Sequence, residues 1–123
     1  MAFYLSSLEV LARLHRGKQV EQWLSYHQEA AYGVIRWLSL YRDKAHTYTV
    51  LYVESFDDGD EHDHNVHEFS TVDPDEFGVA HSFHSAEEAV AYACTYDGAS
   101  ADKFVTAGMI NEEYAQQQKS RQQ

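Results

Sequence analysis

Residues 46–56 read HTYTVLYVESF, the stretch around which the rest of the chain can be arranged. Threonine, tyrosine and valine recur through it, and both of its alternating faces are substantially apolar. β-Branched and aromatic residues favour a pleated, buried backbone. The stretch therefore predicts the clearest strand of the chain.

The segment before this strand, residues 19–42, has two interpretations. Its apolar residues step by three and four positions, as on a helix, yet its second half is rich in β-forming residues. Because Gly33 would cost about 1 kcal/mol inside a helix, we expect a helix over 19–30 and a strand over 33–42. A short RDKA link would then close an antiparallel hairpin with the strand at 46–56. The alternative is one long helix through residue 42.

The segment after the strand predicts two more strands. NVHEFSTV at residues 65–72 indicates a third strand, and VAHSFHS indicates a fourth at about 79–84. The Asp73–Glu76 run between them contains a proline and suits a turn. The acidic stretch FDDGDEHDHNVHEF, residues 56–69, becomes an exposed connection between the second and third strands.

Helix signals lie at both ends of the chain. Ser6 with Glu9 forms a capping box that opens an N-terminal helix, and Ser85 with Glu88 forms another that opens a helix over 86–96. Asn111 opens a last helix, over 111–120. Between these two, KFVTAGMI is either an edge strand or a packed loop.

These elements predict a single α+β domain over residues 1–123. We expect a small antiparallel sheet of three to four strands, flanked by N-terminal and C-terminal helices. The expected strands span about 33–42, 46–56, 65–72 and 79–84, and the expected C-terminal helices span 86–96 and 111–120.

Composition indicates a folded protein of the cytoplasm. Hydrophobic residues make up 44% of the chain and aromatic residues 14%, which is too much apolar surface for intrinsic disorder. The N-terminus lacks the pattern of a secretion signal, and no apolar run is long enough to span a bilayer. A single cysteine, Cys94, excludes an internal disulfide and any zinc motif with several cysteines. We therefore expect a soluble protein in a reducing compartment.

The net charge of −11 is spread unevenly along the chain. Residues 1–53 carry six Lys or Arg and four Asp or Glu, whereas residues 54–123 carry three and sixteen. Residues 54–76 contain ten acidic residues and no basic residue. These acids repel phosphate backbones and anionic lipid surfaces, so we expect no direct nucleic-acid partner and no membrane partner.

The acidic connection is the expected partner-binding site. Its carboxylates would attract a basic protein over a long range. The candidate partner-binding residues are Asp57, Asp58, Asp60, Glu61, Asp63 and Glu68.

A metal site is the competing hypothesis for the same stretch. His62 and His64 would point the same way in an extended backbone, and His67 follows nearby. The spacing matches no zinc motif, and Gly59 makes the loop flexible. We therefore assign no metal ligand and no cofactor, and retain these histidines as the alternative.

No residue is assigned a catalytic role. His81 and Ser82 are neighbours on an expected strand and would face opposite ways, which is poor geometry for a nucleophile and its base. Cys94 lies on the apolar face of an expected helix, where thiols are usually small core residues with a raised pKa. Phosphate-binding glycine loops and other enzyme motifs are absent from the sequence.

The sequence predicts a small acidic binding or inhibitor protein with a basic protein partner. In charge and size it is similar to the small acidic immunity proteins and antitoxins of bacteria, which cover the cationic active site of a nuclease or other toxin. One alternative is an acidic mimic of DNA, and another is the metal-binding protein above. In a further interpretation the acidity serves only solubility.

Overall fold

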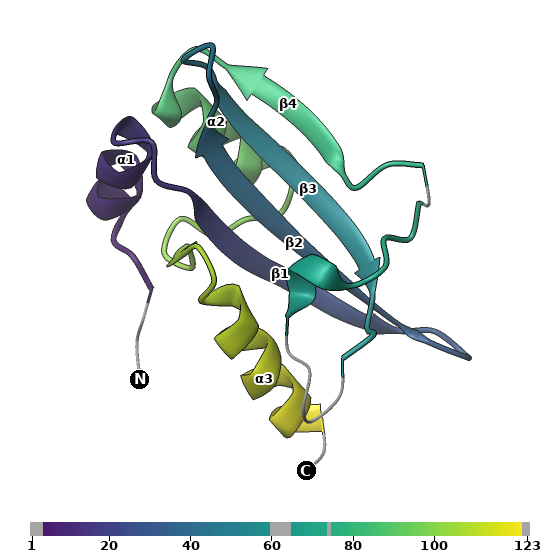
Figure 1. The fold of residues 1–123 in the computed structure, drawn as a ribbon. Coiled ribbons are helices and arrows are strands. Elements are labelled where there is room, and N and C mark those ends of the chain that lie inside the picture. Colours follow the sequence, from purple (N-terminus) through teal and green to yellow (C-terminus); the bar gives the residue numbers. More distant parts are fainter. Residues whose placement is uncertain (1–3, 60–64, 74, 122–123) are drawn as a thin grey trace.

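The computed structural model describes residues 4–59, 65–73 and 75–121. It shows an α+β fold, as expected, with one antiparallel sheet and helices from both ends of the chain (Figure 1). In chain order the elements are α1 (Ser7–His15), β1 (Val20–Gln28), β2 (Gly33–Arg42), β3 (Tyr48–Phe56), η1 (Val66–Glu68), β4 (Val79–Phe83), α2 (Ala86–Tyr96), β5 (Val105–Thr106) and α3 (Ile110–Arg121).

The sheet is built outward from the β2–β3 hairpin. Its strand order is β4-β3-β2-β1-β5, so β2 and β3 lie inside and β4 and β5 are the edges. The Asp43 carboxylate closes the hairpin by accepting hydrogen bonds from the backbone N–H groups of Ala45 (2.9 Å) and Thr47 (3.1 Å). This local capping explains why the predicted hairpin and both of its strands are confirmed.

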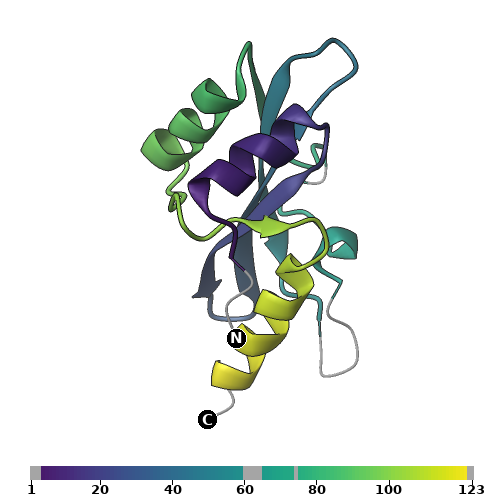
Figure 2. The ribbon, with the colours of Figure 1, turned by 90° about the vertical axis from the view of Figure 1, so that its left-hand side faces the viewer.

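Helices α1 and α2 cover one face of the sheet (Figure 2). Three alanines of α2 are fully buried against this face, and their small side chains let the helix approach the strands closely. The core that they share with α1 and the sheet also contains Leu14, Val20, Leu38, Leu40, Val50 and Phe104. We call this side the helical face.

The opposite face of the sheet carries a second core, which is covered by η1 and α3. Trp37 and Ile35 of β2 are its centre, and both are buried from solvent. Val66 and Phe69 from the η1 segment and Ile110 and Tyr114 from α3 pack onto them. We call this side the opposite face.

The predicted helix over 19–30 is wrong, because this segment is strand β1. It pairs antiparallel with β2 from Val20↔Leu40 to Gln28↔Gly33, with a bulge between Trp23 and Ser25. The bulge places Trp23 and Tyr26, three residues apart, against the same core. Because residues three positions apart also share one face of a helix, this spacing makes the segment resemble a helix in sequence.

The predicted third strand over 65–72 is also wrong. Its first part is the short helix η1, whose start Asn65 caps by accepting a hydrogen bond from the N–H of His67. Val66 and Phe69 are buried at a spacing of three residues, which suits a helical turn and not a strand. The segment keeps only an isolated bridge, Ser55↔Thr71, and β4 takes the place beside β3.

The remaining predicted elements are confirmed. The first helix, the fourth strand and both C-terminal helices lie where their caps and apolar faces indicated. The apolar piece after α2 contributes the edge strand β5, which pairs with β1 at Val20↔Thr106 and Glu21↔Val105. None of the described helices is both long and apolar enough to cross a membrane.

Replacing Ile35 by alanine should lower the free energy of unfolding by about 2–5 kcal/mol, because this side chain is fully buried in the core of the opposite face. Leu8 is the matched control, since its side chain is 77% exposed on α1 and Leu8→Ala should change stability by less than about 0.5 kcal/mol. Urea unfolding measures both values. Equal losses from the two variants would contradict the assignment of the core.

Candidate partner-binding surface

The edge at β4 is the most exposed part of the sheet. Strand β4 pairs with β3 from Tyr48↔Phe83 to Tyr52↔Val79, and it is the last strand on that side. Four successive residues, Val79 to Ser82, are exposed, and the Val79 side chain is 50% exposed. In Figure 1 this strand borders the sheet with no element of the described chain beyond it.

A groove of about 450 Å³ lies where the chain enters β4. We call it the edge groove; its lining residues are Tyr52, Glu54, Val72, Asp73, Glu76, Phe77, Gly78 and Val79. Phe77 is 49% exposed and Val72 40% exposed, so the groove presents apolar side chains beside carboxylates. Gly78 lets the chain pass close to β3, because a Cβ there would lie 2.6 Å from the carbonyl oxygen of Tyr52.

The three carboxylates of the edge groove differ in their interaction partners. Glu54 is paired with the guanidinium of Arg36, with Nε and Oε2 2.8 Å apart. Asp73 accepts a hydrogen bond from the backbone N–H of Asp75 at 2.9 Å. Within the described part of the chain, no cation or hydrogen-bond donor contacts the Glu76 carboxylate. Burial, together with the charge of Glu54, raises the pKa of Tyr52, so the phenol stays neutral and can donate.

The predicted partner-binding residues divide into structural and exposed ones. Asp57 accepts a hydrogen bond from the Tyr114 hydroxyl of α3 at 2.5 Å, and Asp58 accepts one from the backbone N–H of Ser70 at 2.7 Å. Both carboxylates therefore hold the connection in place as well as contributing charge. Glu68 is exposed at the end of η1. Asp60, Glu61 and Asp63 lie outside the described residues.

His67 links this acidic segment to the sheet. Its Nε2 lies 2.5 Å from Oε2 of Glu21, a residue of β1 that is completely buried. Its Nδ1 lies 3.2 Å from Oδ1 of Asn65, and its ring meets Trp37 edge-on at 5.1 Å. Because both ring nitrogens face oxygen acceptors, the imidazolium form fits best. The hydrogen bond to Glu21 is the main cause that raises the pKa of His67.

Glu21 has further hydrogen-bond partners, which compensate for the cost of burying its carboxylate. Its Oε1 accepts a hydrogen bond from the backbone N–H of Gly108 at 2.9 Å, and Gln19 donates to Oε2 at 3.3 Å. The pair with His67 thus joins β1, η1 and the segment before α3. A buried carboxylate with several donors is a structural anchor.

The histidines of the metal hypothesis are only partly placed. His62 and His64 lie outside the described residues, and His67 is engaged by Glu21 and Asn65. Among residues 4–59, 65–73 and 75–121, no three or more metal-ligating side chains form a cluster.

The residues weighed for catalysis take the positions expected of them. His81 lies opposite Val50 of β3, and the centroid of its ring is 5.0 Å from the centroid of the Tyr92 ring. Ser82 points to the other face of β4, where its hydroxyl lies 3.2 Å from that of Thr49. Cys94 is half-buried beside the core of the helical face, and burial raises the pKa of its thiol.

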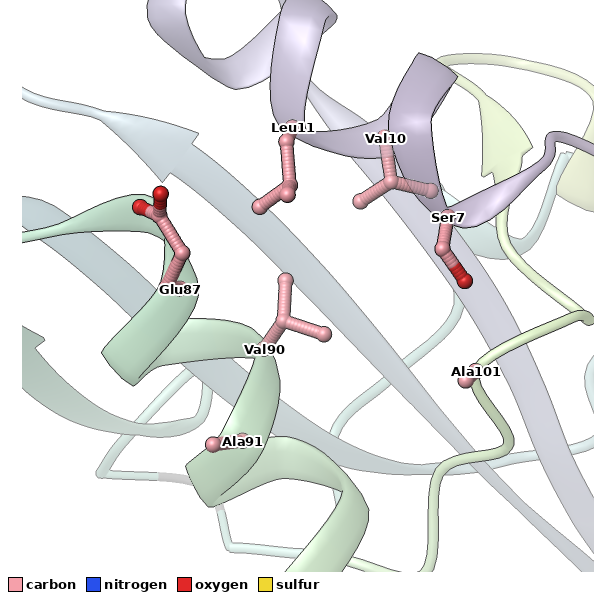
Figure 3. A pocket seen from close by; sticks show the side chains of 7 residues that line it. All are labelled: Ser7, Val10, Leu11, Glu87, Val90, Ala91 and Ala101. Atoms are coloured by element: carbon pink, nitrogen blue, oxygen red, sulfur yellow. The ribbon is translucent and has the colours of Figure 1, made fainter.

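A separate apolar pocket of about 230 Å³ lies between α1 and α2. Figure 3 shows Val10 and Leu11 of α1 turned toward Val90 of α2, with Ser7, Glu87, Ala91 and Ala101 around them. Glu87 is the single acidic side chain in its lining. This pocket therefore carries one carboxylate, whereas the edge groove carries three.

Sequence reasoning missed the apolar half of the candidate surface and the anchor beneath it. Phe77 lies just before the expected fourth strand and Val79 begins it, and the exposure of Val79 depends on β4 being the last strand of the sheet. The predicted helix over 19–30 contains Glu21, and a carboxylate on a helix is unremarkable. In β1 it is completely buried, where a carboxylate is rare, and this burial, which no sequence pattern indicates, marks the polar link.

Stability should depend on pH through His67. A raised pKa in the folded state means that the pair with Glu21 contributes fully below the ordinary histidine pKa of 6.5. This contribution is lost as pH rises through the higher folded-state pKa of His67. The free energy of unfolding of His67→Gln should therefore fall short of the wild-type value by about 1–3 kcal/mol at about pH 6, and by less at about pH 9.

Urea unfolding of both proteins across that pH range measures the difference. His84→Gln, at an exposed position, is the matched control and should show no such trend. A deficit of His67→Gln that stays constant with pH would contradict the charged pair.

In comparisons with known protein families, curated proteins and solved structures, nothing matches this chain. The functional conclusion therefore depends on the surface alone.

Proposed function

We propose that this protein is a small acidic binding protein that docks a basic partner protein through the edge groove and the carboxylates around it. The observation that carries the proposal is the combination of exposed Phe77 and Val79 with Glu76, whose carboxylate has no partner within the described chain. An apolar patch rimmed by charge is typical of an interaction site. Acids without an apolar centre would indicate only a solvated surface.

The two kinds of side chain support different stages of binding. A net charge of −11 with ten acids in residues 54–76 creates a long-range potential that speeds encounter with a cationic surface. Apolar contact by Phe77, Val72 and Val79 acts only after encounter and slows dissociation. Inhibition is the expected outcome when the partner's cationic surface is its active site, as with immunity proteins and antitoxins of toxins and nucleases.

Reversing the charge of Glu68, Asp75 and Glu76 to lysine should abolish capture of a basic protein from an extract of the native host. These three side chains are exposed and make no hydrogen bond or ion pair within the described chain, so the fold should survive. The matched control reverses Glu87, Asp102 and Glu112, which are exposed elsewhere. Both triple variants change the net charge equally.

Capture is measured by affinity purification with each variant, followed by identification of the retained proteins. The proposal requires that the control variant retains the basic protein and the test variant loses it. Equal retention by both variants would instead support acidity that serves solubility alone.

For the captured protein, the association rate should fall steeply between about 0.05 M and about 0.5 M salt, because ions screen the attraction. Phe77→Ala should leave the association rate nearly unchanged and raise the dissociation rate by about tenfold, since apolar contact acts at short range. Stopped-flow or surface-binding kinetics separate these two rates. An association rate that is independent of salt would contradict electrostatic docking.

A further inference from the structure

The hydrogen-bonding direction of each β4 residue can be derived from the neighbouring bridge. At Ser55↔Thr71, the N–H of Val72 donates to the carbonyl of Glu54 and the N–H of Phe56 donates to the carbonyl of Ser70. Even-numbered residues of β3 therefore direct their backbone groups toward the β4 side. On the other side, the N–H of Asp57 donates to the carbonyl of Gly33, which places odd-numbered residues toward β2.

This alternation assigns the backbone groups of β4. Val79, His81 and Phe83 lie opposite the even-numbered Tyr52, Val50 and Tyr48, so their N–H and C=O groups bond to β3. Ala80 and Ser82 then direct their N–H and C=O groups outward, to an edge that no described strand covers. Both residues are exposed, and β4 contains no lysine, arginine or proline that would discourage strand pairing.

Side chains on the helical face continue the surface beyond β4. Tyr92 of α2 lies 5.0 Å from the rings of Phe83, His81 and Tyr96, measured between centroids. Tyr96 is 73% exposed, and a groove of about 330 Å³ at the helix is lined by Phe83, Tyr92, Tyr96 and Glu88 among others. Phenol rings of this kind bind both apolar side chains and cations.

A carboxylate at the end of α2 adds to the negative potential here. Asp97 has one oxygen, Oδ2, that is buried and lacks a hydrogen-bond partner within the described chain. Burial raises the pKa of Asp97, and the charge of His81 acts in the opposite direction. The edge groove at the start of β4 contributes Glu54, Asp73 and Glu76. Glu54 is already paired with Arg36, so Glu76 and the buried oxygen of Asp97 are the groups that an incoming cation would complement.

We infer that β4 accepts an extended, lysine- or arginine-rich segment of the partner as an additional antiparallel or parallel strand of the sheet, bonded to the outward backbone groups of Ala80 and Ser82. This inference rests on the proposed function and specifies how the partner binds. The main-chain bonds supply affinity that does not depend on sequence, and the acidic and aromatic side chains select a basic segment.

A second copy of this chain is a poorer occupant of the same edge. Pairing two β4 strands would bring two edge grooves, each with Glu54, Asp73 and Glu76, toward one another. Two molecules that each carry −11 repel at low ionic strength. A basic segment of a partner protein is instead attracted to these carboxylates.

The test uses a capped peptide of seven alternating lysine and valine residues as the probe, with a serine-valine peptide of equal length as the neutral control. Amide hydrogen exchange of the wild-type protein is followed by nuclear magnetic resonance, with and without peptide. We expect the lysine peptide to slow exchange at Ala80 and Ser82 by about tenfold or more, because free amides become bonded. The amides of Val79, His81 and Phe83 already bond to β3 and should change less.

A variant provides an independent measurement. Ala80→Pro removes one outward N–H without touching the bonds to β3, and should weaken peptide binding by about tenfold. Ala80→Val keeps that N–H and is the matched control, expected to bind as the wild type does. Amide spectra of both variants report whether the sheet is retained.

The outcomes separate this inference from the proposed function. Salt-dependent binding that leaves the amides of Ala80 and Ser82 unprotected would overturn strand addition while supporting acidic docking. Sedimentation showing that the protein forms dimers at these concentrations, with protection that needs no peptide, would assign the edge to a second copy and overturn the inference. No binding of the lysine peptide at about 1 mM would count against both proposals.

Discussion

The antiparallel pairing of β2 with β3 is the interaction on which the rest of this structure depends. It extends from Val34↔Phe56 to Arg42↔Tyr48 and runs through the middle of the sheet. Residues of these two strands alternate between the core under α1 and α2 and the core under η1 and α3. A shift of one residue in this register would exchange the two cores, so the pairing determines where every helix packs.

The same pairing creates the candidate surface. Since β3 is bonded to β2 on one side, its other side is completed by the five-residue strand β4 and, near its end, by the bridge Ser55↔Thr71, and no described strand completes β4 in turn. The connection between them carries the acids, and it is held by hydrogen bonds from Tyr114 to Asp57, from Ser70 to Asp58 and between His67 and Glu21. Charge and open backbone therefore lie together because the connection over residues 57–78 and the edge strand that follows it supply both.

Much of this fold could be predicted from local sequence. The strand at 46–56, the hairpin before it and the capped helices follow from β-forming residues and from Ser6, Ser85 and their partner glutamates, because these signals are local. The β-bulge near Leu24 could not be predicted, since it depends on pairing with β2 and disguises a strand as a helix. For the site, the acids were evident from composition, whereas Phe77 and Val79 became candidates only once β4 was known to be an edge.

Mapping backbone chemical shifts of the protein while its captured basic partner is added tests the central claim most directly. The account predicts that the largest changes fall on residues 75–83 and on the side of α2 that carries Tyr92 and Tyr96, because these groups flank the outward edge of β4. Changes confined to α1, to the pocket between α1 and α2 or to α3 would show that the partner binds elsewhere. In that case the acidic edge would not be the binding surface.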